Sequence, residues 1–229
     1  MKEKIHSIQE WAWSAGNKSI SLFSSHKLQE ISSKSPILFI GGMHGDEPEG
    51  VQLAEEWLNY LNGSTENIKP WILIPCINPD GYTERQRTNG NSVDLNRNFP
   101  SLCWTNEHDK DRYFPGEFAG SEPETTAIVD LIQKVKPSLI IHFHSWKPMI
   151  VYSNKKAERV ARHFSETSKF ELKNDIGYPT PGSLGEYAGN DLDIGVICIE
   201  EQDEMQEQEL STIFPRFKES LIWLVSLES

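Results

Sequence analysis

Histidine and carboxylate side chains follow three separate apolar segments of the chain. His44 and Glu47 stand three residues apart after the first segment. His144 follows the second segment, and Glu200 follows the third. A catalytic zinc ion commonly takes two neutral imidazoles and one carboxylate, and it leaves a fourth position for water. His44, Glu47 and His144 therefore form a candidate zinc site.

The His-x-x-Glu spacing is a weak indicator on its own, because the chain contains it twice. His163 and Glu166 repeat it inside a helical pattern that no apolar strand or glycine turn precedes. We interpret that second pair as an ordinary pair on a helix surface. The first pair differs, since flanking glycines allow the backbone to turn sharply. His142 would share the face of His144 in an extended strand, so the residue pattern leaves His142 open as the third ligand.

Short apolar runs and helical patterns alternate along the chain and predict the elements that position these side chains. Buried strands are expected at 37–40, 71–77, 139–143 and 194–199, and helices at 46–61, from 121–124 to before 137, at 155–168 and, interrupted around Pro215, at the end of the chain. Asp46 is the expected cap of the first helix. Such alternation predicts an α/β fold with a mixed, largely parallel sheet flanked by helices on both faces, in a single catalytic domain over residues 1–229.

The segment 78–120 is long, polar and rich in Gly, Pro and Asn, which is typical of a loop that serves a site. It contains Asn-Pro-Asp-Gly-Tyr at 78–82, Arg-Thr-Asn at 87–89 and Val-Asp-Leu-Asn-Arg-Asn-Phe-Pro at 93–100.

These strings occur in a characteristic order with the Gly-x-His-Gly-x-Glu turn, the Ser-Glu-Pro-Glu-Thr helix start at 121–125, the His-Ser pair and the strand-terminal Glu200. Over residues 37 to 201 the sequence resembles the zinc carboxypeptidase family. Within that family it is most similar to the short bacterial murein peptide amidases, which cleave the γ-D-glutamyl to meso-diaminopimelate bond. The shared features include the stretches 91–100 and 177–183.

The resemblance implies one zinc ion per chain, held by His44, Glu47 and His144, the last because the family's ligand is followed by Ser. It makes Glu200 the general base, with Glu201 as the alternative. It makes His142 a core histidine or a partner of the ligand.

The resemblance also assigns side chains that bind the substrate. Arg87, or less well Arg85, stabilises the developing oxyanion. Asn96 and Arg97 grip the terminal carboxylate of the substrate. Two further roles follow: Asp94 accepts a hydrogen bond from the ligand His44, and Tyr178 closes over bound substrate.

Two departures from the family pattern bear on specificity. Digestive members carry an arginine between the first two ligands, where this chain has Asp46. The segment around Glu186 matches neither the aromatic nor the basic digestive pattern. We hypothesise that Glu186 meets the amine of diaminopimelate.

Composition excludes several classes of partner. The 229 residues contain 22 basic and 34 acidic side chains, a net charge of −12 that opposes binding to nucleic acid and anionic lipid. No signal-like or membrane-spanning apolar run occurs. Three widely spaced cysteines without a C-x-x-C pair indicate a reducing, cytoplasmic location.

The sequence thus predicts a zinc-dependent amide hydrolase, and the resemblance implies that it acts on a small peptide, murein tripeptide, in cell-wall recycling. A general carboxypeptidase or an N-acyl amino acid deacylase is the alternative within the same class. A non-catalytic protein that binds wall peptides is the alternative from another class.

Overall fold

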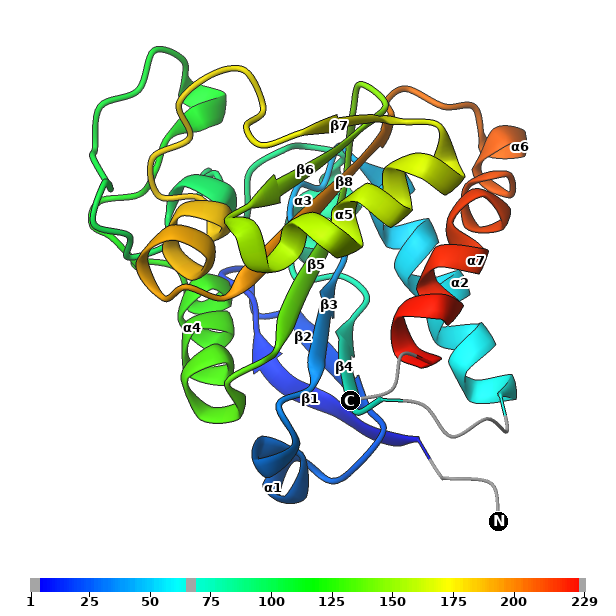
Figure 1. The fold of residues 1–229 in the computed structure, drawn as a ribbon. Coiled ribbons are helices and arrows are strands. Elements are labelled where there is room, and N and C mark those ends of the chain that lie inside the picture. Colours follow the sequence, from blue (N-terminus) through cyan, green and yellow to red (C-terminus); the bar gives the residue numbers. More distant parts are fainter. Residues whose placement is uncertain (1–4, 65–68, 227–229) are drawn as a thin grey trace.

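A mixed β-sheet runs through the middle of the molecule (Figure 1) in a computed structural model that describes residues 5–64 and 69–226. In these ranges the sheet has eight strands in the order β1-β2-β4-β3-β5-β8-β6-β7. The strands are β1 (His6–Trp13), β2 (Ser19–Ser24), β3 (Ile37–Ile40), β4 (Trp71–Ile74), β5 (Leu139–Trp146), β6 (Met149–Ser153), β7 (Glu171–Lys173) and β8 (Gly195–Gln202).

The central strands β4, β3, β5 and β8 are parallel, as the sequence predicts. Their residues are buried almost without interruption because both faces of the sheet are covered. The outer pairs β1/β2 and β6/β8 are antiparallel. The strand boundaries differ from the expected ones. β4 ends at Ile74, whereas β5 and β8 each run three residues further than predicted, so His144 and Glu200 lie within strands.

Helices cover both faces of this sheet, which confirms the predicted layers. They are α1 (Leu28–Ile31), α2 (Pro48–Gly63), α3 (Pro79–Glu84), α4 (Pro123–Val135), α5 (Lys155–Ser168), α6 (Glu207–Leu210) and α7 (Ile213–Ser226). One core joins α2, α5 and α7 to the sheet around Trp57, Phe164 and Phe217. The other joins α4 to the opposite face around Ile128. Figure 1 shows α2 and α7 on one side of the sheet and α4 on the other.

Two predicted helix details are wrong. Helix α2 begins at Pro48 with Glu47 as its cap residue, and Asp46 instead pairs with Arg112. The last helix is not interrupted at Pro215, because this proline lies in the first turn of α7, where its missing N–H costs no helical hydrogen bond. The interruption falls earlier, between α6 and α7.

The segment 78–120 contains α3 and two short 3₁₀ turns, Leu95–Arg97 and Asp111–Tyr113. A third 3₁₀ turn covers Ser32–Lys34, and a π-helical turn covers Gly185–Asp191. No helix in the described residues is long and apolar enough to cross a membrane.

A buried polar cluster holds the segment 78–120 against the start of α4. Asn89 is fully buried and donates from its amide to Glu122, at 2.7 Å, and to Glu124, at 3.1 Å. Asn91, which is exposed, donates to the same Glu122 oxygen at 2.9 Å. Burial raises the pKa of Glu124, whose carboxyl also accepts from the backbone N–H of Ala15.

Asn89→Ala should lower the free energy of unfolding by about 2–4 kcal/mol, because it leaves two buried carboxylates short of a donor. Urea unfolding followed by tryptophan fluorescence measures this cost. Asn91→Ala is the matched control, with an expected cost below about 1 kcal/mol since water replaces its exposed amide. Equal costs for the two variants would contradict the role assigned to the buried amide.

Candidate metal centre and active site

The first two candidate ligands lie on a tight turn between β3 and α2. This turn packs directly on the segment 78–81, and an added Cβ at Gly45 would lie 1.9 Å from the carbonyl carbon of Gly81. Only glycine fits there. The Asn78 side chain joins the two turns, since its amide donates to the carbonyl oxygens of Met43 and Arg87. The Asn-Pro-Asp-Gly string thus supports the His-x-x-Glu turn.

The three predicted metal ligands meet at one point. Glu47 places one carboxylate oxygen 2.7 Å from Nδ1 of His44 and the other 2.8 Å from Nδ1 of His144. The two imidazole nitrogens lie 3.0 Å apart, and all three side chains are buried. Ligand atoms in a tetrahedral zinc site with bonds near 2.0 Å are about 3.3 Å from one another. The set therefore has the donor types and the convergence that zinc requires.

The other ring nitrogen of each histidine has its own partner. Nε2 of His44 lies 3.2 Å from Asp94, and Nε2 of His144 lies 2.8 Å from Nδ1 of His142. A histidine that binds metal through Nδ1 carries its proton on Nε2, so His144 donates to His142. His142 thus faces the far side of the ligand ring, which does not favour it as the third ligand of this set.

Buried charges around the ligands compensate one another. Burial alone would raise the pKa of Asp94, but Arg87 and His44 outweigh it and hold that pKa below its usual range. Burial alone would also raise the pKa of Glu47. The neighbouring His44 and His144 outweigh this effect and keep that pKa well below its usual range. The pKa of His142 lies well below normal, mainly because of burial, so its imidazole is a neutral hydrogen-bond acceptor.

Glu200 lies across the β5–β8 ladder from His144, in direct register. It is buried and accepts a hydrogen bond from Sγ of Cys198 at 3.2 Å. Burial raises its pKa, which suits a carboxylate that accepts and returns a proton near neutral pH. The alternative Glu201 alternates to the other face of β8 and pairs with Arg216.

The Arg87 side chain reaches the group of candidate metal ligands. It donates from Nε to Asp94 at 2.8 Å and lies 3.3 Å from Glu47. Arg85 is exposed and lies in a left-handed turn after α3, so the structure brings Arg87 and not Arg85 to the site.

Two of the predicted substrate-binding side chains line a cavity of about 470 Å³, which His142 also lines. Asn96 and Tyr178 line this cavity together with Glu200. Asn96 is fixed by the backbone N–H of Leu184 at 2.9 Å. Tyr178 is 44% exposed and touches Trp146 edge-on, a position at the rim that suits a closing residue.

Arg97 does not line the cavity but lies close by. Its NH1 donates to the backbone oxygen of Asn96 at 2.7 Å, and its guanidinium stands 5.9 Å from the ring centroid of Tyr113. Sequence reasoning missed Tyr113, which also contacts Arg87. It missed Cys198 as a partner of Glu200 as well. An aromatic residue in a polar loop and a lone cysteine in a strand carry no spacing signal.

Comparison with known proteins identifies the family to which the chain belongs. The model of the zinc carboxypeptidase family matches residues 2–206. The chain belongs to this family. It is 30% identical over 178 residues to murein peptide amidase A of Escherichia coli K12, covering 73% of this chain and 70% of the relative. It is 28% identical over 182 residues to murein peptide amidase A of Vibrio campbellii, covering 75% and 71%.

Solved structures show the same fold. Murein-tripeptide amidase MpaA from Escherichia coli O157 superposes with a TM-score of 0.79 at 25% identity, covering 97% of this chain and 93% of that one. Carboxypeptidase A from Helicoverpa armigera gives a TM-score of 0.77 at 18% identity, covering 96% and 67%. The zinc carboxypeptidase domain is therefore a zinc-dependent hydrolytic enzyme of the amidase and carboxypeptidase type.

His142→Ala should weaken zinc binding about 10- to 100-fold, because it removes the acceptor that holds the ring of His144. Competition with a chromophoric chelator measures the affinity directly. His142→Gln, whose amide oxygen can accept the same hydrogen bond, should recover part of the loss.

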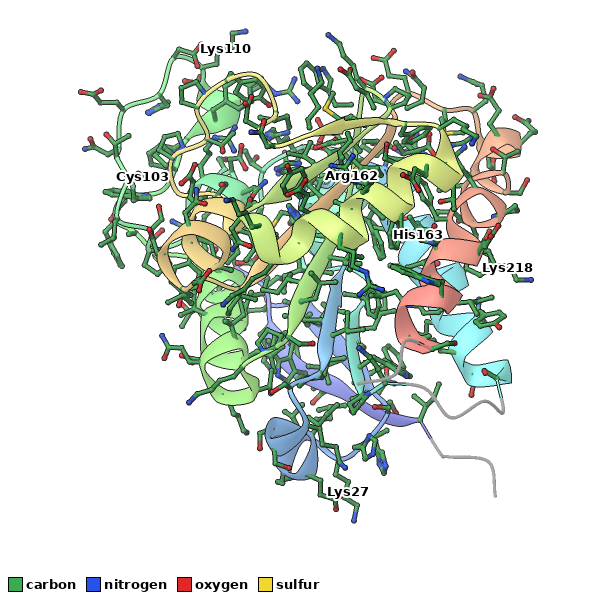
Figure 2. The ribbon with its side chains drawn as sticks, viewed as in Figure 1. Lys27, Cys103, Lys110, Arg162, His163 and Lys218 are labelled. Atoms are coloured by element: carbon green, nitrogen blue, oxygen red, sulfur yellow. The ribbon has the colours of Figure 1, made fainter. Side chains whose placement is uncertain are left out.

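His163→Ala provides the matched control. This histidine lies on α5 and stacks on Trp223 of α7, with ring centroids 3.7 Å apart (Figure 2). Zinc binding by His163→Ala should equal that of the wild type. If His142→Ala also kept wild-type affinity, the hydrogen bond would have no role at the metal.

Proposed function

We propose that this protein hydrolyses the amide bond between γ-D-glutamate and meso-diaminopimelate in murein tripeptide, in the recycling of released cell-wall peptides. The observation that supports this proposal most directly is the convergence of His44, Glu47 and His144 next to Glu200, which lines a cavity large enough for an amino acid. The similarity to the murein peptide amidases supports the choice of substrate. In this proposal residues 1–229 act as one catalytic domain, and wall-peptide recycling makes the cytoplasm the expected location.

The proposed steps assign each side chain one task. Zinc, when bound by His44, Glu47 and His144, polarises the scissile carbonyl and lowers the pKa of water. Glu200 takes the proton of the attacking water and passes it to the departing amine. Arg87 supplies the guanidinium that meets negative charge on the carbonyl oxygen.

The departing amino acid would lie in the cavity. Asn96, which lines the cavity, and Arg97, which follows it in the chain and lies outside the lining, would hold its carboxylate, and Tyr178 would cover it. Asp94 keeps Arg87 and His44 in place, as its two short contacts indicate.

Glu200→Gln should lower the turnover of L-alanyl-γ-D-glutamyl-meso-diaminopimelate by about 10²- to 10⁴-fold, because it removes the proton acceptor. Mass spectrometry of released diaminopimelate gives the rate, and metal analysis confirms that zinc is retained. Release by the wild type should stop on treatment with a chelator and return with zinc.

Full activity of Glu200→Gln would overturn the assigned step. A zinc-loaded wild type that leaves the tripeptide intact would overturn the proposed substrate. Cleavage of simple peptides or N-acyl amino acids would then indicate the carboxypeptidase or deacylase function, and inactivity on all of them a binding protein.

The cavity also carries charge that matches the proposed leaving group. Glu186 and Asp175 line it, and Asn190 holds the Glu186 carboxylate at 2.7 Å. No lysine or arginine of the described chain lines this cavity. We extend the proposal to an ion pair between Glu186 and the distal amine of diaminopimelate.

Glu186→Gln should raise KM for the tripeptide about tenfold with little change in kcat, because the removed charge binds ground state and transition state alike. Steady-state kinetics with the tripeptide separates the two constants. Glu166→Gln, on the exposed surface of α5, is the control for loss of one negative charge. An unchanged KM for Glu186→Gln would remove Glu186 from substrate recognition.

A further inference from the structure

Three guanidinium groups surround the ring of Tyr113. Their central carbons lie 5.3 Å (Arg87), 5.9 Å (Arg97) and 5.6 Å (Arg112) from the ring centroid. The face of an aromatic ring attracts cations, which allows like charges to gather around it. Arg87 and Arg97 already have roles in the proposed reaction. Arg112 has no role in that reaction, although its guanidinium lies near the same ring.

Arg112 comes from the loop between β4 and α4, in the 3₁₀ turn Asp111–Tyr113. Its NH2 group donates to Asp46 at 3.1 Å, and Asp46 lies in the turn that carries the first two metal ligands. This contact holds the loop next to the metal centre. The Arg112 side chain is 53% exposed, and its guanidinium carries further N–H donors besides the one that binds Asp46. Figure 2 marks the outer end of this loop by Lys110.

The position of Arg112 relative to the cavity indicates which part of a substrate it meets. Glu200 lines the cavity that receives the departing amino acid, whereas Arg112, Tyr113 and Asp46 lie outside its lining. The scissile carbonyl has to lie between Glu200 and Arg87. Arg97 contacts Asn96, which lines the cavity, whereas Arg112 contacts Asp46 and Tyr113 and shares the ring of Tyr113 with Arg87. The acyl part of the substrate, which extends from the carbonyl away from the cavity, is therefore the part that we expect Arg112 to meet.

The acyl part of the proposed substrate carries a distinctive group. D-Glutamate linked through its γ-carboxyl keeps a free α-carboxylate, four covalent bonds from the scissile carbonyl carbon and thus up to about 5 Å away. An ordinary α-linked peptide has no carboxylate at this distance in its backbone. A guanidinium fork binds carboxylates with two aligned hydrogen bonds.

We propose that Arg112 binds this free α-carboxylate, with Asp46 orienting its side chain, and thereby selects γ-linked acidic acyl groups. This inference rests on the proposed function and adds a specificity determinant on the acyl side of the cleaved bond. It also explains Asp46, which stands where digestive relatives carry an arginine. In this chain the guanidinium comes from Arg112 on the loop, and Asp46 on the turn is its counter-ion.

The test compares two tripeptides that differ only in this group. One is L-alanyl-γ-D-glutamyl-meso-diaminopimelate, and the other has the α-carboxylate replaced by a carboxamide. The wild type should cleave the acid with a kcat/KM about tenfold higher than the amide, as expected for one charge-assisted contact at an exposed site. Arg112→Gln should lower kcat/KM for the acid to the level of the amide and leave the amide unchanged.

Two controls accompany the comparison. Arg162→Gln removes an arginine of similar exposure, 55%, which pairs with Glu158 within α5 (Figure 2). It should keep the full preference for the acid. Thermal unfolding and zinc content of Arg112→Gln should match the wild type, since the side chain is exposed and touches no ligand.

The outcomes distinguish failure of the proposed function from failure of the role assigned to Arg112. If zinc-loaded wild type cleaves neither tripeptide, the proposed function fails, and this inference fails with it. If it cleaves both equally well, or if Arg112→Gln keeps the preference for the acid, the function stands and the role of Arg112 is overturned.

Discussion

One buried carboxylate, Asp94, connects the parts of the active site. Its side chain is completely buried and meets Nε2 of His44, Nε of Arg87 and the backbone N–H of Asn96. A buried charge is tolerated only when it is paired and hydrogen-bonded, and Asp94 meets this condition by ordering a ligand, an arginine and a substrate-binding turn together. Its backbone N–H also binds the carbonyl of Phe114, which brings in the loop that carries Arg112 and Tyr113.

The sheet supplies the second constraint. His144 on β5 and Glu200 on β8 are neighbours in a parallel ladder, so their distance is set by backbone hydrogen bonds. The two ligands on the turn after β3 join them because β3 pairs with β5 on its other side. The central sheet thus carries the proposed ligand His144 and the proposed base Glu200, while the loops around it carry side chains that we propose contact the substrate.

Sequence reasoning succeeded where one physical rule dominates. Continuous apolar runs predicted the central strands, because strands covered on both faces contain few polar residues. The glycines around His44 and Glu47 distinguished their turn from the second His-x-x-Glu pair, and the family resemblance then implied the ligand set. The N-terminal hairpin β1/β2 escaped prediction, since β1 is mostly exposed and its polar residues hide the pattern. The Arg112–Asp46 pair could not be predicted either, because it joins residues 66 positions apart and neither belongs to a repeating pattern.

The proposed metal ligands come from parts of the chain that are 100 residues apart, from His44 to His144, and the turn at Gly45 packs against Gly81 of a later segment. An unfolded chain therefore contains no preformed site of this kind. Because zinc would bind the native state far better than the unfolded one, its binding free energy adds to the stability of the whole fold. The availability of zinc in the cell would then govern how long the protein persists as well as how fast it works.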